Sequence, residues 1–284
     1  MKPILKWPGG KARLAPAISD AFASRCEGVY YEPFIGSAAV YLHRKAQGEV
    51  GASVLADINP KLVELHKAVR DRVDDVLSEL KSMPRGEDYT EHYYEVREAF
   101  NAGPWEGPRH AARFIWLNRA CFNGLYRENK KGFFNVPVGR YAKLSIPPAA
   151  AFRKVSKLLA DAEIRVADFR ELVAMAGPQD QVYCDPPYVP LNATANFTGY
   201  AKDGFGDPEQ RALAYLARKA AERGADVVLS NHDTPYVVES LYTKEDGFRH
   251  VARPQVTRAI SRSASSRGGV GEVIAAIGPR SVAQ

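Results

Sequence analysis

The chain has 284 residues, of which 45% are hydrophobic and 25% are charged, the usual proportions of a globular protein rather than a disordered or collagen-like one. No apolar run approaches the roughly 18 residues of a membrane-spanning helix. The N-terminal residues include Pro and Gly where a signal peptide has an apolar core. The three cysteines form no CxxC motif. We therefore expect a cytoplasmic protein that acts without a membrane, a disulfide framework or a metal.

Positive charge is concentrated in the middle of the chain. Residues 109–157 contain 11 Lys and Arg and one acid, Glu128, so this segment has a net charge of +10, whereas the whole chain has +6. Such asymmetry is typical of proteins that bind a polyanion. Charged runs are also common on ordinary solvated surfaces, so composition by itself leaves both interpretations open.

Alternating strand and helix patterns open the chain, with a strand expected at 30–35, a helix at 37–47 and a strand at 50–56. Asn59 followed by Pro60 is a typical helix start. The apolar residues of this second helix share one face: Leu62, Leu65, Val69, Val73 and Val76. The order strand–helix–strand–helix predicts parallel strands in an α/β sheet.

The pattern changes in the middle of the chain. Residues 82–110 are polar and aromatic with many turn residues, 111–118 predict a short buried helix, and 119–147 predict a loop or hairpin. The α/β pattern then returns, with strands expected at 163–167, 181–184, 226–229 and 272–277 and a helix at 207–224. The simplest organisation is one α/β domain, residues 1–60 and 148–284, interrupted by an inserted basic domain at 61–147.

Four acids lie at or near the ends of expected strands: Glu32, Asp57, Asp168 and Asp185. Ligands of open α/β sheets bind beyond these carboxyl ends. Asp57 lies 21 residues after Gly36, the spacing at which an acid reaches ribose hydroxyls while the glycine turn lets the backbone approach the ligand. Neither GxGxxG nor GxxxxGK[ST] is present. A nucleoside without phosphates therefore fits best, and S-adenosylmethionine is the obvious candidate.

Asp185-Pro186-Pro187-Tyr188 follows the expected strand at 181–184. The two prolines remove two backbone donors and fix two φ angles, so the motif has a purely structural interpretation as a rigid turn. It also has a chemical one. The Asp185 carboxylate and the Pro186 carbonyl together accept hydrogen bonds from one exocyclic amino group, which favours attack of its nitrogen on a methyl sulfonium. Tyr188 supplies a face on which a base stacks.

These motifs resemble, in order and over nearly the whole chain, those of the Dam family of DNA adenine N6-methyltransferases (D12 class). The matching segments are 5–11 (LKWPGGK), 32–36 (EPFIG), 56–59 (ADIN), 118–139, 183–200 and 230–234. Ala38 stands where the family usually has a second glycine, and the match at 258–261 is loose. The resemblance implies a Rossmann-like S-adenosylmethionine-dependent methyltransferase sheet with an inserted helical and hairpin DNA-recognition domain, whose hairpin covers about 118–141.

The resemblance also assigns roles to individual residues. Contacts with S-adenosylmethionine fall to Trp7, Lys11, Phe34, Gly36, Asp57 and Asp185, to which we add Asp168 at the end of the neighbouring strand. The flipped adenine is held by Asp185, Pro186 and Tyr188. Contacts with DNA fall to Lys6, Phe122, Asn123, Leu125, Arg127, Pro137 and Tyr141, with Phe122 as the wedge beside the flipped base. His232 is expected to be a structural hydrogen-bonding residue, and residues 192–198 a loop over the adenine pocket.

The function expected from these features is an adenine-specific DNA methyltransferase (EC 2.1.1.72). It would flip adenine out of double-stranded DNA, within GATC, and act without a metal as a monomer or weak dimer. Two alternatives remain open. One is N6-adenine methylation at another DNA site or in RNA, and the other is a catalytically silent, sequence-specific DNA-binding regulator.

Overall fold

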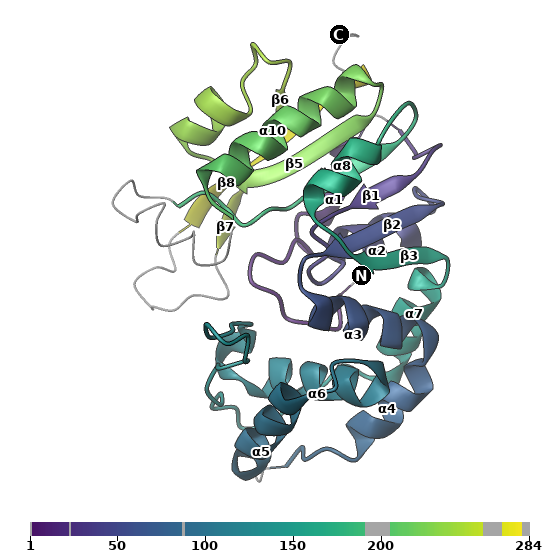
Figure 1. Ribbon diagram of the computed structural model, residues 1–284, viewed down its shortest axis with the longest axis vertical. Helices are drawn as coiled ribbons and strands as arrows, with labels where there is room; N and C mark the ends of the chain where they lie inside the picture. The colour runs from purple at the N-terminus through teal and green to yellow at the C-terminus, as the bar shows by residue number, and fades with distance from the viewer. Residues whose placement is uncertain (1, 23, 87–88, 191–204, 258–268, 280–284) are drawn as a thin grey trace.

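A sheet of eight strands forms the centre of the computed structural model, which describes residues 2–22, 24–86, 89–190, 205–257 and 269–279 (Figure 1). The strand order is β3-β2-β1-β4-β5-β8-β6, and β7 pairs with β8 beside this path. The strands are β1 (Tyr30–Glu32), β2 (Ser53–Asp57), β3 (Ala162–Val166), β4 (Gln181–Cys184), β5 (Asp226–His232), β6 (Arg249–Ala252), β7 (Gln255–Thr257) and β8 (Gly269–Ile277). The expected loop at 192–198 and the loose match at 258–261 lie outside the described residues.

The five neighbouring strands β3, β2, β1, β4 and β5 run parallel to one another. Strand β8 lies between β5 and β6 and is antiparallel to both. Every residue of β1, β4 and β5 is buried. Continuous burial of this kind is typical of parallel strands that are covered on both faces. The arrangement is a doubly wound, Rossmann-like α/β sheet, which confirms the expected fold class.

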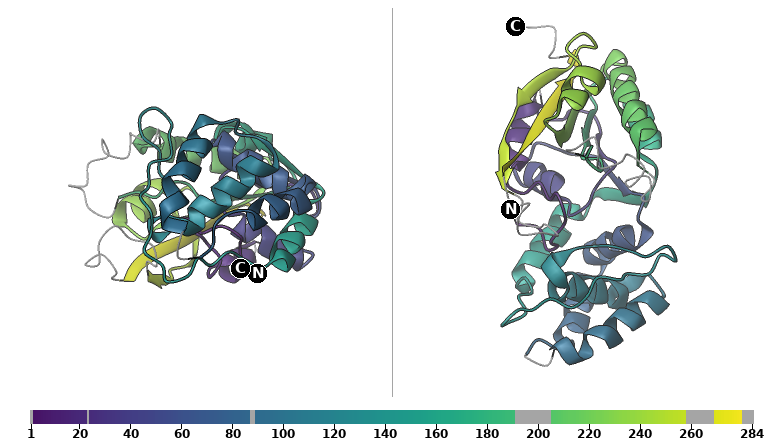
Figure 2. Two further views of the ribbon diagram at one scale, coloured as in Figure 1. Left: turned by 90° about the horizontal axis from the view of Figure 1, so that it is seen from below. Right: turned by 90° about the vertical axis from the view of Figure 1, so that its left-hand side faces the viewer.

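Helices cover both faces of the sheet. One core cluster includes α1 (Ala15–Ala21), α2 (Ala39–Ala46) and α7 (Ala149–Leu159). The other includes α8 (Phe169–Met175), α10 (Asp207–Glu222) and the short π-helix η3 (Val237–Leu241). The green helix α10 and the purple N-terminal helices accordingly lie on opposite sides of the sheet in Figure 2.

A helical lobe lies below the sheet in Figure 1 and consists of α4 (Val73–Lys81), α5 (Tyr89–Ala102) and α6 (Gly107–Ala120), with α3 (Pro60–Asp71) in contact with both parts. The Asn59 side chain caps α3 by accepting hydrogen bonds from two backbone amides. The chain leaves helical geometry at Arg72, with φ −139° and ψ 44°. The apolar face expected over 62–76 therefore belongs to two helices.

The basic segment after α6 is a hairpin that lacks regular strands. It begins with the 3-10 turn η1 (Phe122–Gly124) and is paired only by the isolated bridges Cys121–Val138 and Glu128–Phe134 within the described residues. This confirms the loop or hairpin expected at 119–147. Helix α5, in contrast, lies within the turn-rich region 82–110, because the turn residues flank that helix rather than interrupt it.

Candidate active site

Three carboxylates meet at the carboxyl edge of the parallel strands. Glu32 and Asp57 are the last residues of β1 and β2, and Asp185 directly follows β4. Because β1 lies between β2 and β4, these acids share one edge of the sheet, as the sequence predicts. Asp168 follows β3 and accepts a hydrogen bond from the backbone amide of Arg170 at 2.8 Å. It therefore caps α8, and its expected contact with a cofactor stays a prediction.

The Asp-Pro-Pro-Tyr turn carries a cluster of charges. Lys11 Nζ lies 3.1 Å from Asp185 Oδ1 and 3.8 Å from Glu272 Oε2. The same ammonium lies 4.6 Å from the centre of the Tyr188 ring, within the range of a cation–π contact. The Tyr188 hydroxyl donates a hydrogen bond to Glu272 Oε2 at 2.9 Å. One buried lysine is thus shared by two acids, and the tyrosine ring is held at both its face and its hydroxyl.

Burial raises the pKa of two acids at this edge. It raises the pKa of Asp185, and the positive charge of Lys11 opposes that shift. It also raises the pKa of Glu32 to about 8, although the Tyr30 hydroxyl donates a hydrogen bond to this carboxyl at 2.7 Å. Perturbed acids in a cluster are typical of functional sites. Of these two, only Asp185 has a partly exposed side chain, at 21%, and is accessible to a ligand.

The turn is fixed from β5 and α10. The Val189 amide donates to Asn231 Oδ1 at 3.1 Å, and Gln210 Nε2 donates to the carbonyl of Pro187 at 2.7 Å. Asn231 Nδ2 in turn donates to Gln210 Oε1 at 3.1 Å. His232 packs edge-on against the Tyr188 ring at 4.8 Å and hydrogen-bonds the Val189 carbonyl. The expectation that this histidine is structural agrees with these contacts.

A second part of the site surrounds Gly36. Its amide donates to Asp57 Oδ2 at 3.3 Å, and His66 Nε2 donates to its carbonyl at 2.9 Å. Gly36 has φ +46°, and a Cβ there would lie 2.9 Å from Cδ1 of Trp7, so both backbone and space require glycine. Burial raises the pKa of Asp57 to about 6, and the amides of Asn59 and Gly36 oppose the shift.

The aromatic ring of Phe34 contacts a different group of side chains. It stacks on Phe169 with ring centres 5.6 Å apart and meets Phe205 edge-on at 5.7 Å. The contacts of the structure thus join Gly36 to Trp7 and Asp57, whereas the expected cofactor contact of Phe34 stays a prediction.

The N-terminal segment joins the hairpin. The side chain of Asn118 accepts a hydrogen bond from the Lys6 amide at 2.8 Å and donates one to the Lys6 carbonyl at 2.7 Å. Lys6 Nζ lies 4.8 Å from the centre of the Tyr141 ring. Burial and the charge of Arg119 lower the pKa of Lys6. The structure therefore unites two predicted DNA-binding residues that are far apart in the sequence.

The remaining predicted DNA-binding residues lie along the hairpin itself. Phe122 is 42% exposed, and Arg127 and Pro137 are also exposed. Leu125 and Asn123 are partly buried, and Asn123 has a left-handed backbone with φ +55°. The Phe122 amide donates to the Pro137 carbonyl at 2.9 Å. The exposed ring, the guanidinium and the prolyl ring are thus presented by one piece of chain.

Two residues near the site were missed by the sequence analysis. Glu272 lies on β8, and its only sequence signal is one acid in an apolar strand. Ile58 directly follows Asp57 and is 70% exposed. The sequence shows only that an isoleucine follows an acid at an expected strand end, whereas its exposure, which offers an apolar face to a ring, is seen in the structure.

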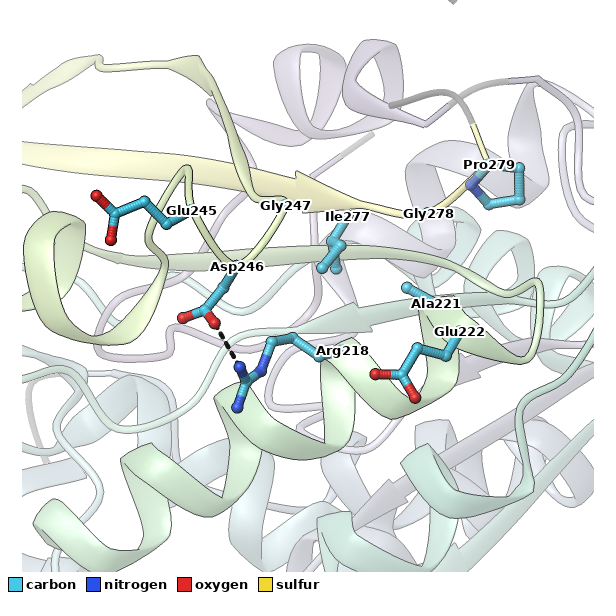
Figure 3. Close-up of a pocket in the computed structure, with 9 residues that line it drawn as sticks. All are labelled: Arg218, Ala221, Glu222, Glu245, Asp246, Gly247, Ile277, Gly278 and Pro279. Atoms are coloured by element: carbon cyan, nitrogen blue, oxygen red, sulfur yellow. Dashed lines mark hydrogen bonds and ion pairs between the residues drawn. The ribbon is translucent and has the colours of Figure 1, made fainter. Parts of the chain in front are cut away.

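The cavity drawn in Figure 3 lies elsewhere. It is lined by Arg218, Asp246 and Ile277, among others. Ile277 pairs with Val227 at the amino end of β5, whereas the carboxylates lie at the carboxyl ends of the strands. In the part of the chain that the structure describes, no cluster of His, Cys, Asp and Glu has the arrangement of a metal site, and no helix is long and apolar enough to cross a membrane.

A doubly wound sheet with acids at its carboxyl edge and an Asp-Pro-Pro-Tyr turn has the architecture of α/β enzymes, whose ligands bind at that edge. The family model for D12 class N6 adenine-specific DNA methyltransferases matches residues 7–260. The chain therefore belongs to this family, as its resemblance to known motifs implies, and it is an adenine-specific DNA methyltransferase.

Several relatives are similar over most of their length. A type II methyltransferase of Methanocaldococcus jannaschii is 40% identical over 81% of this chain and 84% of its own. The DNA adenine methylase of Haemophilus influenzae is 38% identical over 98% of this chain and 94% of its own. That of Escherichia coli is 36% identical over 97% of this chain and 95% of its own.

Proposed function

We propose that this enzyme transfers a methyl group from S-adenosylmethionine to N6 of an adenine that is flipped out of double-stranded DNA, within the sequence GATC (EC 2.1.1.72), as a monomer or weak dimer. The observation that carries the proposal is the Asp-Pro-Pro-Tyr turn, in which Asp185 is partly exposed and ion-paired with Lys11 while Tyr188 is held by Glu272. The catalytic roles of Asp185, Pro186 and Tyr188 belong to the proposal.

Asp185 and Pro186 act on the amino group of the base. The lone pair of adenine N6 is delocalised into the ring, so the amino group is a weak nucleophile. When the Asp185 carboxylate and the Pro186 carbonyl accept its two hydrogens, electron density at N6 rises. The nitrogen that has gained a methyl group must then lose a proton, and Asp185 Oδ is the adjacent acceptor. Lys11 favours the charged carboxylate, because its positive charge opposes the rise that burial causes in the pKa of Asp185.

The region around Gly36 fits the cofactor. Asp57 has the acceptor oxygens that ribose hydroxyls need, Ile58 offers an exposed apolar face to a purine, and Gly36 lets the backbone approach the ligand. Trp7, Lys11, Phe34, Asp168 and Asp185 complete the set that we assign to cofactor binding. When bound, S-adenosylmethionine supplies a methyl group already activated by a sulfonium, so the residues of this chain need only bind and orient.

The hairpin fits duplex DNA. N6 of adenine lies inside the base stack, so the base must leave it at a cost of a few kcal/mol. The exposed ring of Phe122 is suited to fill the resulting gap. Arg127 is suited to read a guanine through two hydrogen bonds. We assign further DNA contacts to Lys6, Asn123, Leu125, Pro137 and Tyr141. The choice of GATC rests on the match of these positions to the recognition hairpin of the family.

A restriction-protection assay tests the proposal. Unmethylated plasmid is incubated with protein and S-adenosylmethionine and then cut with one nuclease that methylated GATC blocks and one that requires it. We expect protection from the first and cleavage by the second. Transfer of labelled methyl groups without this pattern would refute GATC but keep the reaction. No transfer to duplex DNA would contradict the proposal and favour RNA as the substrate or a regulator without catalysis.

A further inference from the structure

Residues 109–157 contain eleven basic residues and a single acid, Glu128. It lies on the hairpin to which we assign DNA contacts. An acid in such a position repels phosphates and weakens binding to every sequence. Its presence there calls for a compensating role, and its contacts indicate one.

Glu128 is held by two donors from different parts of the chain. Its Oε1 accepts a hydrogen bond from Lys61 Nζ at 2.8 Å and another from the Tyr126 hydroxyl. The Lys61 side chain is only 5% exposed, whereas that of Glu128 is 30% exposed. Lys61 Nζ also donates to the Gly132 carbonyl and lies 4.2 Å from the centre of the Trp105 ring. One buried ammonium therefore joins the first arm of the hairpin, at Glu128, and the turn at its tip, at Gly132, to the start of α3.

Tyr126 extends this contact toward the proposed cofactor region. Its ring stacks on Trp7 with centres 5.5 Å apart and on Phe114 with centres 5.0 Å apart. Trp7 is the residue that closes over Gly36. Tyr126 is flanked in the sequence by Leu125 and Arg127. The ring stack and the hydroxyl together fix the chain between these two neighbours.

We propose that the Lys61–Glu128 ion pair, through Tyr126, positions the hairpin residues that read the DNA sequence and so determines specificity. This inference rests on the proposed function of the hairpin. Arg127 Nε donates to Asn135 Oδ1 at 2.7 Å, so its guanidinium direction depends on the pairing of the two arms. If the Glu128 carboxylate is removed, the buried ammonium of Lys61 must be hydrated instead. The hairpin tip then moves outward to admit water.

A positioning role of Glu128 and a purely electrostatic effect of its charge predict different results for Glu128→Gln. Removal of a surface acid strengthens binding to all duplexes alike and leaves their ratio unchanged. Removal of a positioning acid lowers the ratio of affinities for a GATC duplex and for duplexes with one base changed. Lys61→Met removes the other partner while it keeps the length of the side chain, and it has the same expected effect on the ratio.

The experiment measures binding and methylation by wild type, Glu128→Gln, Lys61→Met and the double variant on GATC and on single-base variants of that site. We expect each single variant to lower the discrimination ratio by about tenfold, the loss of one well-placed base contact. The double variant should lose no more than the larger single loss, because the two residues act as one pair. The discrimination ratios are compared at saturating S-adenosylmethionine, because Tyr126 also stacks on Trp7, which we assign to cofactor binding. The control is Glu79→Gln, which removes an acid paired with Arg109 at 3.3 Å on the helical lobe, away from the hairpin.

A second measurement does not depend on DNA. Lys130 and Lys131 are exposed at the hairpin tip, and trypsin cleaves there faster if the tip is released from Lys61. Faster cleavage in Glu128→Gln than in Glu79→Gln supports the inference. Unchanged cleavage together with an unchanged discrimination ratio overturns it. If wild type neither distinguishes nor methylates any duplex, the proposed function and the specificity role of the ion pair are both contradicted. Proteolysis then shows separately whether the Lys61–Glu128 pair holds the hairpin.

Discussion

The affinity of the enzyme for S-adenosylmethionine should depend on the protonation of Asp57. Burial raises the pKa of this carboxyl to about 6 in the free protein. Ribose hydroxyls donate hydrogen bonds, so they need the ionised form. A raised pKa means that the binding-competent form is present above pH 6 and is lost as the pH falls through that value. Burial lowers the pKa of His66, which contacts the same glycine, to about 4, so this histidine titrates below the window.

The expected magnitude follows from this pKa. About one-tenth of Asp57 is ionised at pH 5 and nearly all at pH 8, so the dissociation constant should rise by about tenfold between pH 8 and pH 5. Calorimetric titration across that range measures it. Asp57→Asn should bind weakly with little pH dependence, which separates Asp57 from Glu32 and Asp185, whose pKa values are also raised. Equal affinity of wild type at pH 5 and pH 8 would refute the assignment.

Three further predictions concern chemistry, recognition and stability. Asp185→Ala should lower the methylation rate by at least about a hundredfold without loss of the fold seen by circular dichroism, and activity within about tenfold of wild type would contradict its role. Arg127→Ala should relax specificity at one guanine, whereas Lys143→Ala should weaken binding on all sequences alike; competition binding on single-base variants distinguishes them, and equal losses for Arg127→Ala would exclude base reading. Because burial raises the pKa of the Glu32 carboxyl to about 8, this group should lower the free energy of unfolding by about 2 kcal/mol between pH 6 and pH 8. In urea unfolding, the change between these two pH values should therefore differ by about that amount between wild type and Glu32→Gln.

Local signals explain why much of the site is predictable from the sequence. Asn59 and Pro60 start a helix because of their own backbone chemistry, and the structure has the cap. Strand β4 is predicted with its observed bounds because its apolar run ends at Asp185. Once the strands are parallel, the rule that ligands bind at carboxyl ends brings Asp57 and Asp185 to one edge. These inferences need only neighbours in the sequence and one rule of topology.

The residues that the sequence does not predict are those that depend on contacts between distant parts of the chain. Glu272 reaches Tyr188 across 84 residues, and Lys61 reaches Glu128 across 67. Periodicity and spacing carry no information about such pairs, because each depends on the packing of whole elements. An acid in an apolar strand or a lysine after a helix cap has an ordinary structural interpretation until its partner is known.

Gly124 illustrates how a motif gains its physical reason only from the fold. In the sequence it is one letter of a match to a recognition hairpin. In the structure it has φ +64°, and a Cβ would lie 2.5 Å from Cδ of Lys6 and 2.8 Å from its Cβ. The glycine therefore serves a left-handed turn and a close approach at once. That approach brings the N-terminal lysine to the hairpin, so a basic residue that composition alone cannot assign to any surface becomes part of the proposed DNA-binding face.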